Sequence, residues 1–104
     1  MKLSVVMPIH NEESFLPYSL PSVFRLNPDE VILIFDRCTD GSVNVAREIS
    51  KKFDYLSKTV FIELNDPSPD WAYRVAFLSR YGFKIAKGDV ILMTAADIIM
   101  DSNT

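Results

Sequence analysis

Four short apolar runs rich in Val and Ile most constrain what this chain can fold into. They are LSVVMPI (residues 3–9), VILIF (31–35), TVFIEL (59–64) and VILMT (90–94). Runs of this length without a polar residue at every second position are typical of strands that are buried on both faces. The sequence therefore predicts four strands that form the interior of one sheet.

Amphipathic segments separate the runs and predict helices. Residues 14–26 place Leu16, Leu20 and Val23 on one face, although Pro21 predicts an irregular turn there. A proline in a helix interior removes one backbone hydrogen bond. We therefore expect a short first helix between the first two strands.

Two further segments repeat this pattern. Residues 41–53 place apolar residues four apart after a candidate N-cap, and residues 70–87 line up apolar residues three to five apart before Gly88, which predicts the helix end. The apolar residues are Val45, Ile49 and Phe53 in the first segment and Trp71, Val75, Leu78 and Phe83 in the second, and the candidate N-cap of the first is Thr39 or Asp40.

The alternation of strands and helices predicts the fold class. Strand–helix–strand units close through right-handed crossovers, which make neighbouring strands parallel. Four such strands form a Rossmann-like α/β half-domain, with a mainly parallel four-stranded sheet flanked by helices. In such sheets ligands bind beyond the carboxyl ends of the strands, near the point where strand order reverses.

Composition limits the partners and the location. The 104 residues are 48% hydrophobic, which predicts a single domain over residues 1–104. A net charge of −3 argues against nucleic acid or an anionic membrane as a partner. The single Cys38 excludes an intramolecular disulfide, which fits a reducing compartment. The first apolar stretch is interrupted by Pro8 and His10 before it reaches the length of a membrane span. We therefore expect a cytoplasmic protein without an integral membrane segment.

Polar segments follow three of the predicted strands. They read PIHNEE after the first strand, DRCTDGS after the second and TAADIIMD after the fourth. Each has an ordinary explanation by itself: a helix start at Asn11 and Glu12, a turn at Asp40, or a solvated acid at Asp97. All three nevertheless fall on the carboxyl edge of one sheet, and Asp36 ends a buried run. This coincidence predicts a binding site at that edge.

These segments contain three recognisable motifs. The residues concerned are Pro8, Asn11 and Glu12 after the first strand, Asp36 with Thr39, Asp40, Gly41 and Ser42 after the second, and Gly82, Ala86, Gly88 and Asp89 before the fourth. Together they resemble the motifs of inverting, family-2 type glycosyltransferases with the GT-A fold. The resemblance covers nearly the whole chain. The first two motifs are specific in combination, whereas the third is weak by itself.

The resemblance implies a site for the nucleoside of a nucleotide-diphosphate sugar. The residues implied are Pro8, Ile9, His10 and Glu12 after the first strand and Asp36 after the second. A carboxylate such as Asp36 can accept hydrogen bonds from a base N–H or a ribose hydroxyl. His10 stands where the family often has an aromatic residue, which favours packing against the base over acid–base chemistry.

Three arginines are candidates for the diphosphate. The resemblance places Arg74 and Arg80 near it, where a guanidinium could contact phosphate oxygens. The alternative for both is a solvated helix face, paired with Asp70 or Asp89. Arg37 is a further phosphate candidate because it is adjacent to Asp36. Cys38 has no neighbouring histidine in the sequence, so a packed loop cysteine is favoured over a nucleophile.

The resemblance also implies a divalent metal ion, Mg²⁺ or Mn²⁺. The family binds it through an Asp-x-Asp motif, and the corresponding residues here are Ala95, Ala96 and Asp97. The first acid is missing. Because magnesium is often held by one or two carboxylates and the substrate phosphates, Asp97 is the predicted ligand once nucleotide is bound.

The implied activity is transfer of a sugar from a UDP- or GDP-linked donor to an acceptor hydroxyl with inversion. Members of the family are more than twice as long, so we expect either the donor-binding part of a longer enzyme or a naturally short relative. No catalytic base is identified. The alternative is a non-catalytic nucleotide-binding or assembly module. A third alternative, a nucleotidyltransferase, would require a Gly-rich basic loop after the first strand. The segment PIHNEE is neither Gly-rich nor basic.

The predicted fourth strand has a further consequence. Residues 90–94 should lie at an open edge of the sheet, with Ile91 and Met93 exposed. Unpaired strand edges are templates for association between chains. We therefore expect a homodimer that covers this edge.

Overall fold

A four-stranded parallel sheet organises the part of the chain that the computed structural model describes, residues 1–64 and 80–96. The strands are β1 (Leu3–Ile9), β2 (Glu30–Asp36), β3 (Thr59–Leu64) and β4 (Val90–Met93). Their bounds differ from the predicted runs by at most one residue at either end. The Rossmann-like α/β fold class predicted from the sequence is confirmed.

Strand order places the switch point beside β1. The order is β3-β2-β1-β4, so the chain steps outward from β1 to β3 and then returns to the other side of β1. All three strand pairs are parallel, with Ile9 opposite Phe35 and Asp36 opposite Leu64. The carboxyl ends of β1 and its neighbours therefore border the position where such sheets bind ligands.

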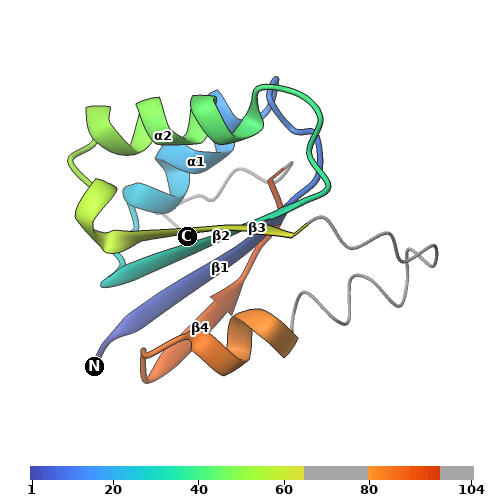
Figure 1. Ribbon diagram of the computed structural model, residues 1–104. Helices are drawn as coiled ribbons and strands as arrows, with labels where there is room; N and C mark the ends of the chain where they lie inside the picture. The colour runs from blue at the N-terminus through green and yellow to red at the C-terminus, as the bar shows by residue number, and fades with distance from the viewer. Residues whose placement is uncertain (65–79, 97–104) are drawn as a thin grey trace.

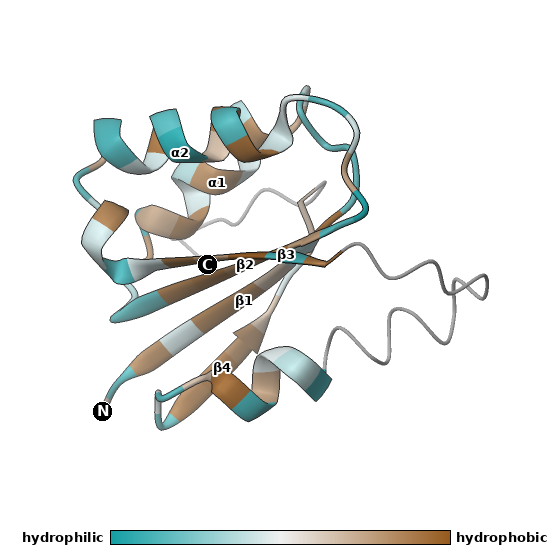
Figure 2. Cartoon of the chain, in the orientation of Figure 1, coloured by the Kyte–Doolittle hydropathy of each residue, from teal (hydrophilic) through white to brown (hydrophobic). Residues whose placement is uncertain are grey.

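Helices cover both faces of the sheet. The helices α1 (Leu16–Phe24) and α2 (Ser42–Lys52) lie together on one face, and the helical residues 80–85 lie on the other (Figure 1). A short 3₁₀ turn, η1 (Leu56–Lys58), which the sequence did not predict, links α2 to β3. Figure 2 shows hydrophobic strands between these layers and a hydrophilic outer side on α2.

The two faces of the sheet divide the core by alternation along each strand. Odd-numbered residues of β1 and β2, such as Met7 and Leu33, pack in the cluster beneath α1 and α2. Even-numbered residues, such as Val6 and Ile34, pack with the residues around 80–86. Because successive side chains point to opposite faces, Asp36 falls on the same face as Ile34.

The first helix buries the predicted face. Leu16, Leu20 and Val23 are each fully buried. The helix begins at Leu16, two residues later than predicted, and Pro17 lies in its first turn, where a missing N–H costs little. Pro21 lies inside the helix, and the helix continues past it to Phe24.

The second helix packs through small residues. Ser42, Ala46 and Ser50 are its buried positions, and the predicted apolar residues Val45 and Ile49 flank them and are half-buried. Small side chains at the centre allow the helix to approach its neighbours closely. The N-cap is Gly41 rather than the predicted Thr39 or Asp40.

The helical residues 80–85 approach the sheet through a glycine. A Cβ atom on Gly82 would lie 2.3 Å from Cγ1 of Val6. Tyr81 and Ile85 pack against the cluster that contains Val6. The prediction that Phe83 faces the core is wrong, because its side chain is 51% exposed. The remaining predicted apolar residues of this helix, Trp71, Val75 and Leu78, lie outside the described residues.

Within the described residues β4 is an edge strand, as predicted. Its residues Ile91 and Met93 are not exposed, which corrects the expectation from the sequence. Both are half-buried and pack against the cluster of Val6, Ile32 and Ile34. Helix packing on this face supplies the cover that sequence reasoning did not foresee.

In residues 1–64 and 80–96, each helix is too short or too polar to cross a lipid bilayer.

Candidate functional site

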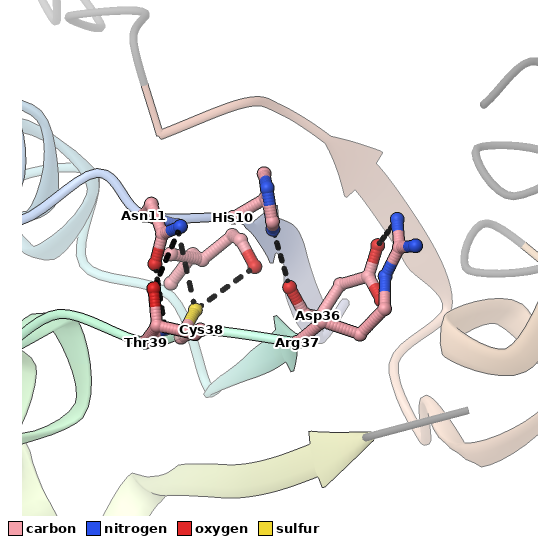
Figure 3. A network of polar contacts seen from close by, with 7 residues as sticks. His10, Asn11, Asp36, Arg37, Cys38 and Thr39 are labelled. Carbon is pink, nitrogen blue, oxygen red and sulfur yellow. Dashed lines mark hydrogen bonds and ion pairs between the residues drawn. The ribbon is translucent and has the colours of Figure 1, made fainter. Parts of the chain in front are cut away.

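Two loops continue from the carboxyl ends of neighbouring strands. Residues 10–15 follow β1 and residues 37–41 follow β2, and we call them the first loop and the second loop. Figure 3 shows Asn11 of the first loop directed toward Cys38 and Thr39 of the second loop across the sheet edge. The polar motifs predicted to form a site therefore meet in space.

Asn11 joins the two loops. Its backbone is left-handed, with φ of 51°, a conformation that Asn tolerates better than most residues. Its side-chain Oδ1 accepts hydrogen bonds from the amides of Thr39 at 2.7 Å and Asp40 at 3.3 Å, and its Nδ2 donates to Thr39 Oγ1 at 3.3 Å. One amide side chain thus binds the second loop at three points, and Figure 3 shows its contact with Thr39.

Acidic side chains make reciprocal bonds between the loops. Glu13 Oε2 accepts from the Gly41 amide at 2.8 Å, and Asp40 Oδ2 accepts from the Glu13 amide at 3.2 Å. Ser42 Oγ accepts from the Glu12 amide at 3.0 Å and donates to Asp40 Oδ1 at 2.6 Å. Most residues of the Asn-Glu and Thr-Asp-Gly-Ser motifs therefore serve to hold the two loops together.

Asp40 also anchors the amino end of α2. Burial is the largest single effect and acts to raise the pKa of Asp40, but the hydrogen bonds from Ser42 and from the Glu13 amide together outweigh it and lower this pKa. The Ser42 amide donates to its Oδ1 at 3.0 Å. Asp40 thus binds the first-turn amide of α2 although Gly41 occupies the N-cap position.

Cys38 is packed within the loop pair. Its Sγ lies 3.5 Å from the Ile9 carbonyl oxygen, to which it donates, and 3.5 Å from the Asn11 amide. Burial raises the pKa of the Cys38 thiol, and the nearby charge of Asp40 adds to this effect. A protonated, packed thiol is a poor nucleophile, which agrees with the prediction of a loop cysteine.

Asp36 is a buried carboxylate at the end of β2. Its side chain is 1% exposed, and Arg37 contacts both of its oxygens, with Nε 3.1 Å from Oδ1 and Nη2 3.4 Å from Oδ2. Burial of a charge is costly without a partner of opposite sign, so this pair stabilises the ionised form. The acid predicted as the centre of the site is thus contacted on both of its oxygens by a guanidinium.

Arg37 has an unusual backbone conformation. Its φ is 49°, which for a residue other than Gly, Asn or Asp costs roughly 1–3 kcal/mol. Its amide donates to the Leu64 carbonyl at 2.8 Å, which ties the turn to β3. Strain of this kind persists where the surrounding fold imposes it.

His10 connects the ends of β1 and β2. Its Nδ1 lies 2.7 Å from the backbone oxygen of Asp36. Because a carbonyl oxygen only accepts hydrogen bonds, Nδ1 must carry the proton in this contact. In the neutral ring Nε2 is then an acceptor, so the structure assigns both the orientation and the tautomer of the imidazole.

The other predicted residues after the first strand take different positions. Pro8 is half-buried in β1 opposite Ile34, and the Ile9 side chain lies in the core beneath α1 and α2, so that Ile9 faces the site only through its backbone. The Glu12 carbonyl accepts from the amides of Phe15 and Leu16 and so starts α1.

The predicted basic and metal-binding residues are placed only in part. Arg80 is exposed at the first of the helical residues 80–85. Arg74 and Asp97 lie outside the described residues, so their contacts with a diphosphate or a metal ion stay predictions. Among the described residues no three His, Cys, Asp or Glu side chains gather as a metal site, and Ala96 is buried in the core.

The third motif lies away from this site. The Gly88 amide donates to Ser4 Oγ at 2.8 Å, and Asp89 Oδ2 accepts from the Lys2 amide at 2.9 Å, both at the amino edge of the sheet. A Cβ on Gly88 would lie 2.4 Å from Ser4 Oγ and 2.8 Å from the Ser4 amide nitrogen. Close packing against Ser4 explains the glycine at position 88, and the hydrogen bond from the Lys2 amide explains the acid at position 89.

Two features of the site were not foreseen from the sequence. One is the set of hydrogen bonds by which Asn11 and Glu13 hold the second loop. The tolerance of Asn for a left-handed backbone was the only sequence signal that could have indicated the role of Asn11. The other is the pairing of Arg37 with Asp36. Neighbouring residues in a strand point to opposite faces, so sequence reasoning had no ground to pair them.

The chain is similar to known proteins in sequence and in fold. A family model described as Glycosyl transferase family 2 matches residues 4–104. The undecaprenyl-phosphate 4-deoxy-4-formamido-L-arabinose transferase of Aeromonas hydrophila is 36% identical over 101 residues, which are 92% of this chain and 29% of that protein. The chain thus spans less than a third of the length of this relative.

Two solved structures share the fold. A mannosyltransferase from Pyrobaculum calidifontis in complex with GDP-Man and Mn²⁺ matches with a TM-score of 0.80 and 19% identity, over 97% of this chain and 29% of that one. The TarS protein of S. aureus in complex with UDP-GlcNAc matches with a TM-score of 0.68 and 24% identity, over 93% of this chain and 27% of that one.

Proposed function

Because this chain belongs to glycosyl transferase family 2, we propose that it binds the sugar-nucleotide donor of a glycosyl transfer reaction. The observation that carries the proposal is Asp36, a buried carboxylate at the carboxyl edge of the sheet next to the switch point. The two structural neighbours bound to UDP-GlcNAc and GDP-Man support a nucleoside diphosphate sugar as the ligand class.

The loop pair supplies the nucleoside pocket in this proposal. Asp36 accepts hydrogen bonds from a base N–H or a ribose hydroxyl, and each such bond to a charged group contributes roughly 1.5–3 kcal/mol. The His10 ring, held by the Asp36 carbonyl, packs beside the base. The backbone from Pro8 to Glu12 borders the nucleoside, while Arg80 and Arg74 remain candidates for the diphosphate.

The proposed reaction is direct displacement. The acceptor hydroxyl attacks the anomeric carbon, the bond from that carbon to the phosphate oxygen breaks, and the nucleoside diphosphate leaves with the bonding electrons. The sugar configuration is thereby inverted. No described residue is assigned as the base that takes the hydroxyl proton, and the acceptor is not assigned either.

A divalent metal ion would neutralise the charge of the diphosphate. The described residues do not form a site for it by themselves, so no step here depends on it. Mg²⁺ or Mn²⁺ held by Asp97 together with the phosphates stays our prediction. A cytoplasmic location is part of this proposal, because a chain with the single Cys38 forms no intramolecular disulfide and so needs no oxidising compartment.

The second candidate function is a non-catalytic nucleotide-binding or assembly module. Ala95 at the position of the first metal-binding acid favours it. Incubation of the protein with UDP-GlcNAc or GDP-Man distinguishes the two, because only the enzyme releases UDP or GDP by hydrolysis or transfer.

Calorimetry with UDP and GDP, with and without Mn²⁺, tests donor binding. We expect Asp36→Asn to raise the dissociation constant about tenfold or more, because a neutral amide loses the charged acceptor. Asp54→Asn is the matched control, since Asp54 is exposed and its φ of 59° suits Asn. A dissociation constant for Asp36→Asn within threefold of the wild type would refute the assignment.

A further inference from the structure

Arg37 contacts both oxygens of the carboxylate at the centre of the proposed donor site. Its Nε is 3.1 Å from Oδ1 of Asp36 and its Nη2 is 3.4 Å from Oδ2. Two-point contact with a planar guanidinium fixes the plane of a carboxylate, which one hydrogen bond does not. We propose that Arg37 is a positioning residue that orients Asp36 toward the nucleoside of the donor, an inference that rests on the proposed function.

The backbone of Arg37 makes this contact possible. In a continuing strand the side chain of Arg37 would point to the face opposite Asp36. The left-handed turn, with φ of 49°, ends that alternation, and Figure 3 shows the guanidinium folded back beside the carboxylate. The Arg37 amide is held by the Leu64 carbonyl at 2.8 Å. The fold thus maintains an unfavourable backbone conformation in which the guanidinium reaches Asp36.

Pairing with Arg37 is compatible with ligand binding by Asp36. A carboxylate can accept about four hydrogen bonds, so the guanidinium and a ligand can contact the same group. A buried acid without a nearby cation tends to take up a proton and would then present a donor as well as an acceptor. Arg37 therefore keeps Asp36 an acceptor and sets its direction.

The alternative role for Arg37 is direct contact with phosphate, and the two roles predict different ligand dependence. A residue that orients Asp36 affects recognition of the nucleoside, which mono- and diphosphates share. A residue that contacts the diphosphate affects the diphosphate more. Comparing UMP with UDP, and GMP with GDP, separates these roles.

The test is calorimetric titration of the wild type, Arg37→Asn, Arg37→Lys and Arg25→Gln with UMP, UDP, GMP and GDP. Arg37→Asn removes the charge while Asn tolerates the left-handed backbone, and Arg37→Lys keeps the charge without the planar fork. Arg25→Gln is the matched control, since Arg25 is exposed at the far end of α1. We expect Arg37→Asn to weaken mono- and diphosphate binding by the same factor, about tenfold, and Arg37→Lys to weaken it less.

Chemical rescue provides a second readout. Guanidinium ion at millimolar concentration should recover part of the nucleotide affinity of Arg37→Asn and leave the wild type unchanged. Unchanged or tighter binding by Arg37→Asn, or a loss that is larger for UDP than for UMP, overturns the inference while the proposed function stands. Absence of nucleotide binding by the wild type overturns both.

Discussion

At the scale of single residues, glycines show how closely the backbone is packed. Gly82 brings the helical residues 80–85 onto Val6, which is fully buried in β1. Gly41 leaves room for the Glu13 carboxylate, since a Cβ there would lie 2.5 Å from Oε2. A Cβ on Gly82 would meet a core side chain, whereas a Cβ on Gly41 would meet the end of a flexible surface side chain. The two positions should therefore differ in their tolerance of a substitution by alanine.

We expect Gly82→Ala to lower the free energy of unfolding by about 1–2 kcal/mol, since overpacking against Val6 exceeds the gain in helix propensity. Gly41→Ala is the matched control and should cost less than about 1 kcal/mol, because Glu13 can rotate away at the loss of one exposed hydrogen bond. Urea denaturation measures both. A Gly82→Ala protein more stable than the wild type would show that the helix does not pack this closely.

At the scale of elements, the two loops act as one unit that joins β1, β2 and the amino ends of both helices. Asp40 is central because its carboxylate accepts from the Ser42 amide, the Ser42 hydroxyl and the Glu13 amide. These bonds need the charged form of Asp40 for their full strength. Protonation of Asp40 should therefore loosen the attachment of α2 to the first loop.

The pKa of Asp40 is lower in the folded protein than its ordinary value of 3.8, so its contribution to stability is present above that pH and is lost as pH falls below it. Asp40→Asn should therefore lower the melting temperature at pH 6–7, and the difference from the wild type should shrink below about pH 4. Glu48→Gln, on the exposed surface of α2, is the control. A difference that stays constant from pH 7 to pH 3 would contradict the role of the charge.

At the scale of the whole molecule, the sheet has two edges within the described residues, β3 and β4. The Val90 amide donates to the carbonyl of Lys2, directly before β1, and the Thr94 amide donates to the carbonyl of Val6 within β1. Because amides alternate in direction along a strand, those of Ile91 and Met93 point away from β1. The outer side of β4 therefore presents backbone groups that a further strand could pair with.

We predict that this chain forms a two-fold dimer through β4 at micromolar concentration, which light scattering can measure. Val90→Lys should give a monomer, because a lysine on an edge strand opposes pairing. Val60→Lys on β3 is the matched control, since the two valines are 43% and 42% exposed. A monomeric wild type whose Ile91 and Met93 amides exchange freely would rule out the dimer but keep the open edge.

The local pattern of the sequence was sufficient to predict the strands and the buried face of α1. Apolar runs and the spacing of Leu16, Leu20 and Val23 depend on short-range periodicity, which the chain itself contains. The end position of Asp36 followed from the same runs. The resemblance to family-2 glycosyltransferases, confirmed by the family match, rested on short motifs after those strands.

Only the tertiary structure decided which side chains meet. Phe83 lost its predicted place in the core because Gly82 contacts β1, a choice that depends on the opposing strand rather than on helical spacing. The bonds from Asn11 to Thr39 and Asp40 join residues 28 and 29 positions apart, and strand pairing brings them together. Arg37 pairs with Asp36 only because its backbone is left-handed, whereas the alternation of side chains along a strand would place the two on opposite faces. The surrounding fold imposes this backbone conformation, and the local sequence pattern does not predict it.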